Sequence, residues 1–138
     1  MRYIHIWKLA GIVLGLSLAA ACGGGGTSPS PNPGGGGTGG PGPVGATMTI
    51  DASGTLTPSS VTINNGESVR FVNNHNTPHQ MASDPHPAHT DCPPINALPT
   101  LGAGQSGQTN ALTTSRTCGV HDHLNDTSIN LRGSIVIR

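Results

Sequence analysis

Apolar and polar residues alternate in four short segments of this chain. Alternation with a period of two puts every second side chain on one face, which is typical of strands with one buried face. The segments are 47–51, 60–64, 68–74 and 134–138, and their predicted inward-facing residues are Met48, Ile50, Val61, Ile63, Val69, Phe71, Ile135 and Ile137. Several short strands of this kind predict an all-β sandwich or barrel.

One long segment, residues 74–99, interrupts the alternation. It is rich in proline, histidine and aspartate, and it contains His79, His86, His89 and Cys92. Long loops of this composition in a small domain are usually functional. We therefore expect the segment to be a loop that carries part of a binding site.

The N-terminal part has a different organisation. Residues 1–21 combine Arg2 and Lys8 with an apolar run and small residues, the layout of a secretory signal peptide. The letters LSLAAAC resemble the lipobox of bacterial lipoproteins, which implies a lipid on Cys22 and attachment at the periplasmic face of a membrane or the cell surface. Ordinary cleavage that leaves Cys22 unmodified is the alternative. Residues 22–45 are almost all Gly, Pro, Ser and Thr, and we expect a disordered linker there.

The remaining segment, 46–138, is expected to fold as one domain. It contains four arginines, six carboxylates and no lysine, so no basic patch indicates a nucleic-acid partner. Phe71 is its only aromatic residue. Because so small a core is marginal, a metal ion or a disulfide would help to stabilise the domain, which we expect to be a monomer.

The letters CGVHDHLND bring Cys118, His121 and His123 close together near the end of the chain. Two imidazoles and one thiolate form a trigonal set that suits copper. We expect Cys118 and His121 to approach one ion from a tight loop, and His79 to complete the set from elsewhere in the fold.

Four stretches, taken in order, resemble the cupredoxins of the plastocyanin and azurin type: SSVTINNGESVRFVNNHNTPHQM, LGAGQSGQT, RTCGVHDH and GSIVIR. The resemblance implies a Greek-key β-sandwich that binds one copper ion. It also implies that His79, Cys118 and His121 are the equatorial ligands. One-electron transfer to a redox partner protein is the function that the family suggests.

The axial ligand departs from the family pattern. A methionine would be expected at Asn125 or Asp126, and neither position has one. His123 is the preferred substitute, while Met81 and an oxygen of residue 125, residue 126 or the backbone are alternatives. Asp122, which lies between two histidines, is a candidate to orient one imidazole by a hydrogen bond.

Cys92 leaves a second interpretation open. With Cys22 lipidated, two cysteines remain, and in an oxidising compartment Cys92 and Cys118 would pair as a disulfide. The site would then contain histidines alone, drawn from His79, His86, His89, His121 and His123. Such a site fits a copper-handling or scavenging module, or a small dismutase-like copper enzyme, better than an electron carrier. A role for Cys92 as a second thiolate ligand is the alternative to the disulfide.

Overall fold

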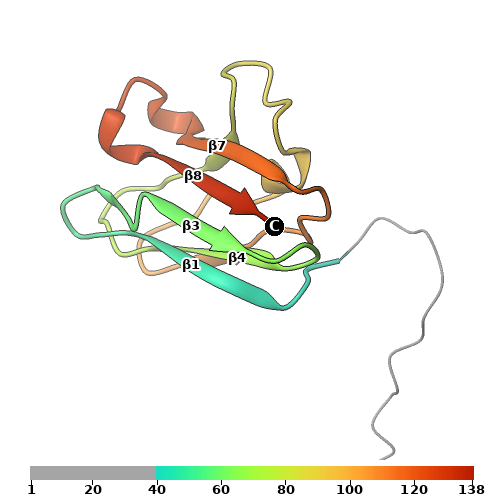
Figure 1. The fold of residues 1–138 in the computed structure, drawn as a ribbon. Coiled ribbons are helices and arrows are strands. Elements are labelled where there is room, and N and C mark those ends of the chain that lie inside the picture. The colour runs from blue at the N-terminus through green and yellow to red at the C-terminus, as the bar shows by residue number, and fades with distance from the viewer. Residues whose placement is uncertain (1–39) are drawn as a thin grey trace, which may run out of the picture. The chain divides into compact units, whose positions relative to one another are not determined.

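The computed structural model describes residues 40–138, which form two four-stranded β-sheets packed as a sandwich (Figure 1). The first sheet has the order β2-β1-β4-β6, with β1 (Val44–Ile50), β2 (Leu56–Thr57), β4 (Ser68–Asn73) and β6 (Ser106–Gln108). The second has the order β3-β8-β7-β5, with β3 (Ser60–Ile63), β5 (Met81–Ser83), β7 (Arg116–Asp122) and β8 (Arg132–Ile137). Three short 3₁₀ helices lie between the strands of the described residues: η1 (Pro93–Ile95) between β5 and β6, and η2 (His123–Asn125) and η3 (Ile129–Leu131) between β7 and β8. The predicted all-β sandwich is confirmed.

The core lies between the sheets and is built from the alternating apolar positions. Seven of the eight predicted inward-facing residues are buried, and Val61 packs against them at the margin. The same cluster is completed by the aliphatic side chains of Leu56, Ile95, Leu98, Leu101 and Leu112. The period-two pattern therefore identified the faces of these strands correctly.

The first and last strands of the domain each pair in parallel with another strand. β1 runs parallel to β4, and β3 runs parallel to β8, so segments far apart in sequence lie side by side. β1 begins at Val44, two residues before the expected start of the domain, because the carbonyl oxygens of Gly42 and Pro43 already accept hydrogen bonds from Ser68. The expected signal peptide, Cys22 and the linker up to residue 39 lie outside the described residues.

Four strands were missed in the sequence, namely β2, β5, β6 and β7. β5 and η1 lie inside the segment expected to be one loop, and all three residues of β5 are buried. β7 was missed because its first residues, Arg116 and Thr117, are polar and exposed and hide the alternation that follows. Within the described part of the chain, no helix is both long and apolar enough to cross a membrane.

Candidate metal centre

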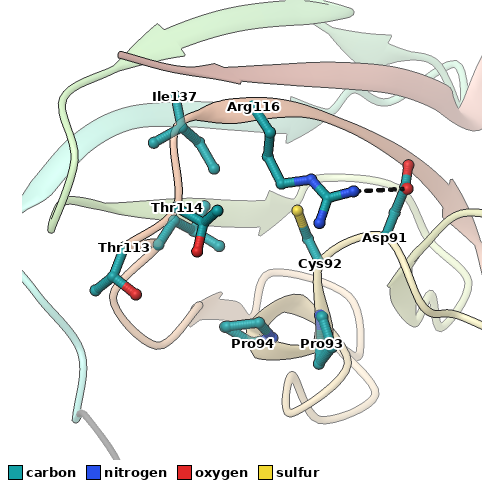
Figure 2. A pocket seen from close by; sticks show the side chains of 9 residues that line it. Asp91, Cys92, Pro93, Pro94, Thr113, Thr114, Arg116 and Ile137 are labelled. Atoms are coloured by element: carbon teal, nitrogen blue, oxygen red, sulfur yellow. Dashed lines mark hydrogen bonds and ion pairs between the residues drawn. The ribbon is translucent and has the colours of Figure 1, made fainter.

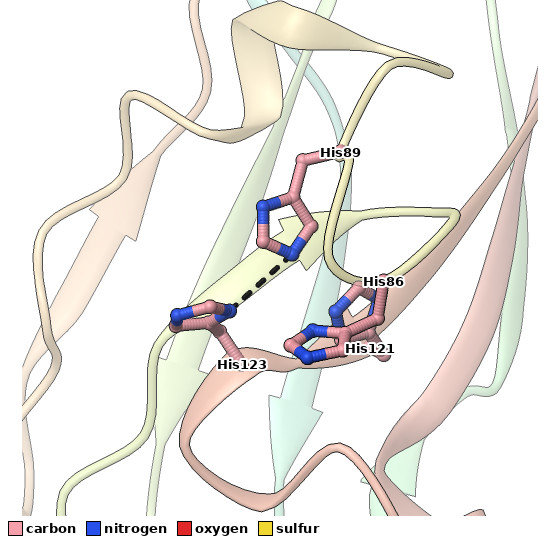
Figure 3. A group of neighbouring side chains, drawn as sticks. All are labelled: His86, His89, His121 and His123. Atoms are coloured by element: carbon pink, nitrogen blue, oxygen red, sulfur yellow. Dashed lines mark hydrogen bonds between the residues drawn. The ribbon is translucent and has the colours of Figure 1, made fainter.

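Four histidines gather where the end of β7 meets the loop after β5 (Figure 3). His121 is in β7 and His123 begins η2, whereas His86 and His89 come from the loop. One ring nitrogen from each lies within 4.8 Å of the others. We call His86, His89, His121 and His123 the four-histidine group.

Local geometry explains why two distant segments meet there. β5 pairs with β7 so that Ala82 lies opposite His121, and the chain then turns above that strand end. The turn is closed by hydrogen bonds from the His89 N–H to the Pro85 carbonyl (2.7 Å) and from the Asp91 N–H to the Asp84 carbonyl (2.8 Å). These bonds fold the loop back over β7, so that the loop histidines His86 and His89 lie near His121.

His121 is the buried member of the group. Its Nδ1 lies 2.7 Å from Oδ1 of Asp84, and an ionised carboxylate can only accept, so Nδ1 is the protonated nitrogen. In a neutral ring Nε2 then carries a lone pair, and this atom is buried with no hydrogen-bond partner. A buried acceptor without a partner is costly, and a metal ion would satisfy it.

Gly119 allows Asp84 to approach this closely. Gly119 lies two residues before His121, on the same face of β7, and a Cβ there would overlap the Asp84 carboxylate. The Asp84 N–H also donates to the Gly119 carbonyl at 3.0 Å. Asp84 is therefore anchored to β7 through both its backbone and its side chain.

Electrostatics favour a neutral ring at His89. Desolvation, followed by the neighbouring charges of His121, His123 and His86, lowers the pKa of His89 below its ordinary value of 6.5. The His89 Nε2 lies 3.3 Å from Nδ1 of His123. A neutral imidazole is the form that binds a metal ion, so the grouping prepares the His89 ring as a ligand.

His79 lies in a separate cluster on the core-facing side of β7. Its Nδ1 lies 2.8 Å from Oδ2 of Asp122, and its Nε2 lies 2.9 Å from Nδ1 of His75. The other oxygen of Asp122 accepts hydrogen bonds from the backbone N–H groups of Gln80 and Leu124. Asp122 thus orients an imidazole as expected from the sequence, and that imidazole is His79.

Cys118 and His121 point to opposite faces of β7. Cys118 and Val120 face the core, while Gly119 and His121 face the Asp84 loop. The expected tight loop is wrong, because the segment is a regular strand and residues three apart on a strand face opposite sides. The structure therefore does not bring His79, Cys118 and His121 together around one point.

The two remaining cysteines form a disulfide. Cys92 and Cys118 are bonded with their Cα atoms 5.9 Å apart, and both are buried. Met81 is buried in the hydrophobic cluster that also contains both cysteines.

A small pocket beside Cys92 holds the ion pair of Arg116 with Asp91 (Figure 2). It contains no histidine, so it is not part of the four-histidine group.

Solved structures of similar architecture identify the fold. A purple cupredoxin from Nitrosopumilus maritimus matches 67% of this chain and 99% of its own length, with a TM-score of 0.53 and 16% identity. Oxidised plastocyanin from the fern Dryopteris crassirhizoma matches the same shares at a TM-score of 0.52 and 21% identity. The fold is that of the cupredoxins.

A mutant amicyanin in its Cu(I) form gives a third cupredoxin match, at a TM-score of 0.51 and 15% identity over 68% of this chain and 82% of that one. No protein-family model and no curated protein matches the chain in sequence. At these identities the likeness to cupredoxins concerns the fold, so the site must be judged from its own residues.

Asp84 is the residue of the site that sequence reasoning missed. The only available signal was its position in the run SDPHPAH, two residues before His86. Nothing in that run indicates that the carboxylate contacts His121, because the contact depends on the pairing of β5 with β7. His86 and His89, in contrast, were recognised as candidates from the sequence.

Proposed function

We propose that this domain is a copper-binding module whose ion is held by the four-histidine group alone. The observation that carries the proposal is the buried, unpartnered Nε2 of His121 in a group of four neighbouring ring nitrogens. Imidazole nitrogens suit copper and other borderline transition-metal ions, whereas Mg²⁺ and Ca²⁺ prefer oxygen. The cupredoxin architecture makes copper the favoured ion.

The arrangement combines a rigid ligand with adjustable ones. His121 is held by Asp84, while His86 and His123 are exposed and His89 is half-buried. The exposed rings have room to adjust around an ion. Four neutral nitrogen donors would favour Cu(II) over Cu(I) more than a thiolate does, which suits capture and storage of the oxidised ion.

Electron transfer through thiolate-bound copper is the second candidate. Its support is the likeness to plastocyanin, of which oxidised and reduced structures are known. It requires a reduced Cys118 whose sulfur reaches the face on which His121 lies. The disulfide and the opposite orientation of these two residues favour the histidine-only site instead.

A membrane location is a further part of the proposal, supported by the sequence alone. The signal-like segment 1–21 and the lipobox cysteine Cys22 would anchor the chain at the periplasmic face or cell surface. The Gly/Pro-rich linker would then hold the metal-binding domain away from the lipid.

The test is a Cu(II) titration of the purified protein, with affinity measured by chelator competition and ligation measured by electron paramagnetic resonance. We expect a tight first equivalent with nitrogen hyperfine structure. Replacing the exposed ligands in His86→Ala and His123→Ala should each weaken the affinity at least tenfold. Asn125→Ala, on the same surface turn as His123, is the matched control and should bind like wild type. Unchanged affinity in both histidine variants would contradict the proposal.

A further inference from the structure

The six histidines of the described residues fall into two groups, not one. Four form the four-histidine group, and the other two, His75 and His79, form what we call the inner histidine pair. His79 of the inner pair contacts Asp122 on the core-facing side of β7, whereas His121 contacts Asp84 on the other side. Each group thus contains one buried histidine whose Nδ1 is held by an aspartate.

Three donor atoms converge at the inner pair. Nδ1 of His75, Oγ1 of Thr77 and Nε2 of His79 form a triangle with sides of 2.8, 2.9 and 3.3 Å. A circle through the three atoms has a radius of about 1.8 Å, slightly less than a Zn–N bond of about 2.0–2.1 Å. One ion can therefore contact all three atoms without any of them moving far.

The protonation of His79 suits a ligand. Its Nδ1 donates to the Asp122 carboxylate, so in the neutral ring Nε2 carries the lone pair that points at His75 and Thr77. The proton in the 2.9 Å contact between the two rings is therefore carried by Nδ1 of His75. When an ion binds, His75 stays neutral by carrying its proton on Nε2, so Nδ1 is free to bind the ion.

The backbone around the pair is preorganised. The side chain of Asn73, which is fully buried, donates to the carbonyls of Thr77 and Leu101 and accepts from the His75 N–H. The His79 N–H and carbonyl are paired with Leu101. Because both ends of the 73–79 turn are held, the three donors converge before any ligand arrives.

We infer that His75, Thr77 and His79 form a second site for a divalent transition-metal ion, with Asp122 as the carboxylate that orients His79. Two imidazoles and a hydroxyl leave coordination positions for water, so this site should be weaker than the four-histidine group. The inference does not depend on what the four-histidine group binds.

The test is a Zn(II) titration of the purified protein, followed by long-range ¹H–¹⁵N NMR of the imidazole nitrogens. We expect Nδ1 of His75 and Nε2 of His79 to shift with a second equivalent of Zn(II). In His75→Ala the His79 shift should be lost, while the four-histidine resonances respond as in wild type. Asn76→Ala, an exposed neighbour in the same turn, is the matched control and should keep both responses.

A second variant keeps both histidine rings, so that a loss of binding cannot be attributed to misfolding of His75→Ala. Thr77→Val keeps the shape of the side chain and removes the hydroxyl donor, and it should weaken the second binding step severalfold. If Zn(II) shifts only the four-histidine group at saturation, the second site is wrong and the proposed function stands. If only His75 and His79 shift, the second site is supported, and the Cu(II) titration decides the four-histidine proposal separately.

Discussion

His121 and Asp84 are joined by a 2.7 Å hydrogen bond although they come from different segments of the chain. Asp84 begins the loop that carries His86 and His89, and His121 lies near the end of β7, the strand that leads to His123. One contact therefore connects the two segments that supply the four-histidine group, and it also selects the ring nitrogen that is left free.

Removing the Asp84 carboxylate should weaken metal binding. We expect Asp84→Ala to lower Cu(II) affinity by about 10- to 100-fold, the usual cost of losing a carboxylate behind a ligating histidine. In the metal-free protein, ¹⁵N NMR should show His121 losing its preference for the Nδ1–H tautomer. Asp84→Asn keeps an oxygen acceptor and should restore much of both properties. An unchanged tautomer in Asp84→Ala would show that the carboxylate does not orient the ring.

A methyl group at Gly119, on the strand that carries His121, should also disturb the contact between Asp84 and His121. We expect Gly119→Ala to displace the Asp84 carboxylate and reduce Cu(II) affinity, because the new Cβ would overlap it. Chelator competition measures the change. Gly102→Ala is the matched control, since its new Cβ would meet only the end of the Gln105 side chain and should leave binding unaltered.

The disulfide should contribute to stability and exclude a thiolate site. Cys92 and Cys118 are 26 residues apart, so the bond should stabilise the fold by about 3–4 kcal/mol through loop closure. Urea unfolding of oxidised and reduced wild type measures this directly, without truncating a side chain. The oxidised protein loaded with Cu(II) should also lack an intense thiolate charge-transfer band. A strong band, with two titratable thiols after copper removal, would favour the electron-transfer site.

Asp51 should make the domain less stable in acid. A hydrogen bond from the Ser53 hydroxyl, followed by those from backbone N–H groups of Thr55 and Ser53, lowers the pKa of Asp51 below 3.8. The unfolded chain therefore binds this proton first as the pH falls. The stabilisation is present above about pH 4 and is lost as the pH drops through the folded-state pKa. Urea unfolding at pH 3 and pH 5 should show a smaller difference for Asp51→Asn than for wild type, and Ser53→Ala should lie between them.

The strands were predictable where one face meets the core and the other meets water. Met48, Phe71 and Ile135 lie in segments of clear alternation, and each is fully buried. β5 gave no such signal because Met81, Ala82 and Ser83 are all buried, which removes the polar half of the pattern. The candidate site was predictable in composition, since its four histidines were all among the candidate residues.

The chain by itself determined an all-β sandwich and a site of histidines and cysteines near the end of the chain. It left open whether Cys118 binds a metal or pairs with Cys92, and it did not indicate which histidines meet. Tertiary structure decided both questions through β7. On a strand, neighbouring residues face opposite sides, so Cys118 was directed into the core towards Cys92 and His121 outwards to Asp84. Long-range pairing of β5 with β7 then brought His86 and His89 over His121, a contact that no local pattern encodes.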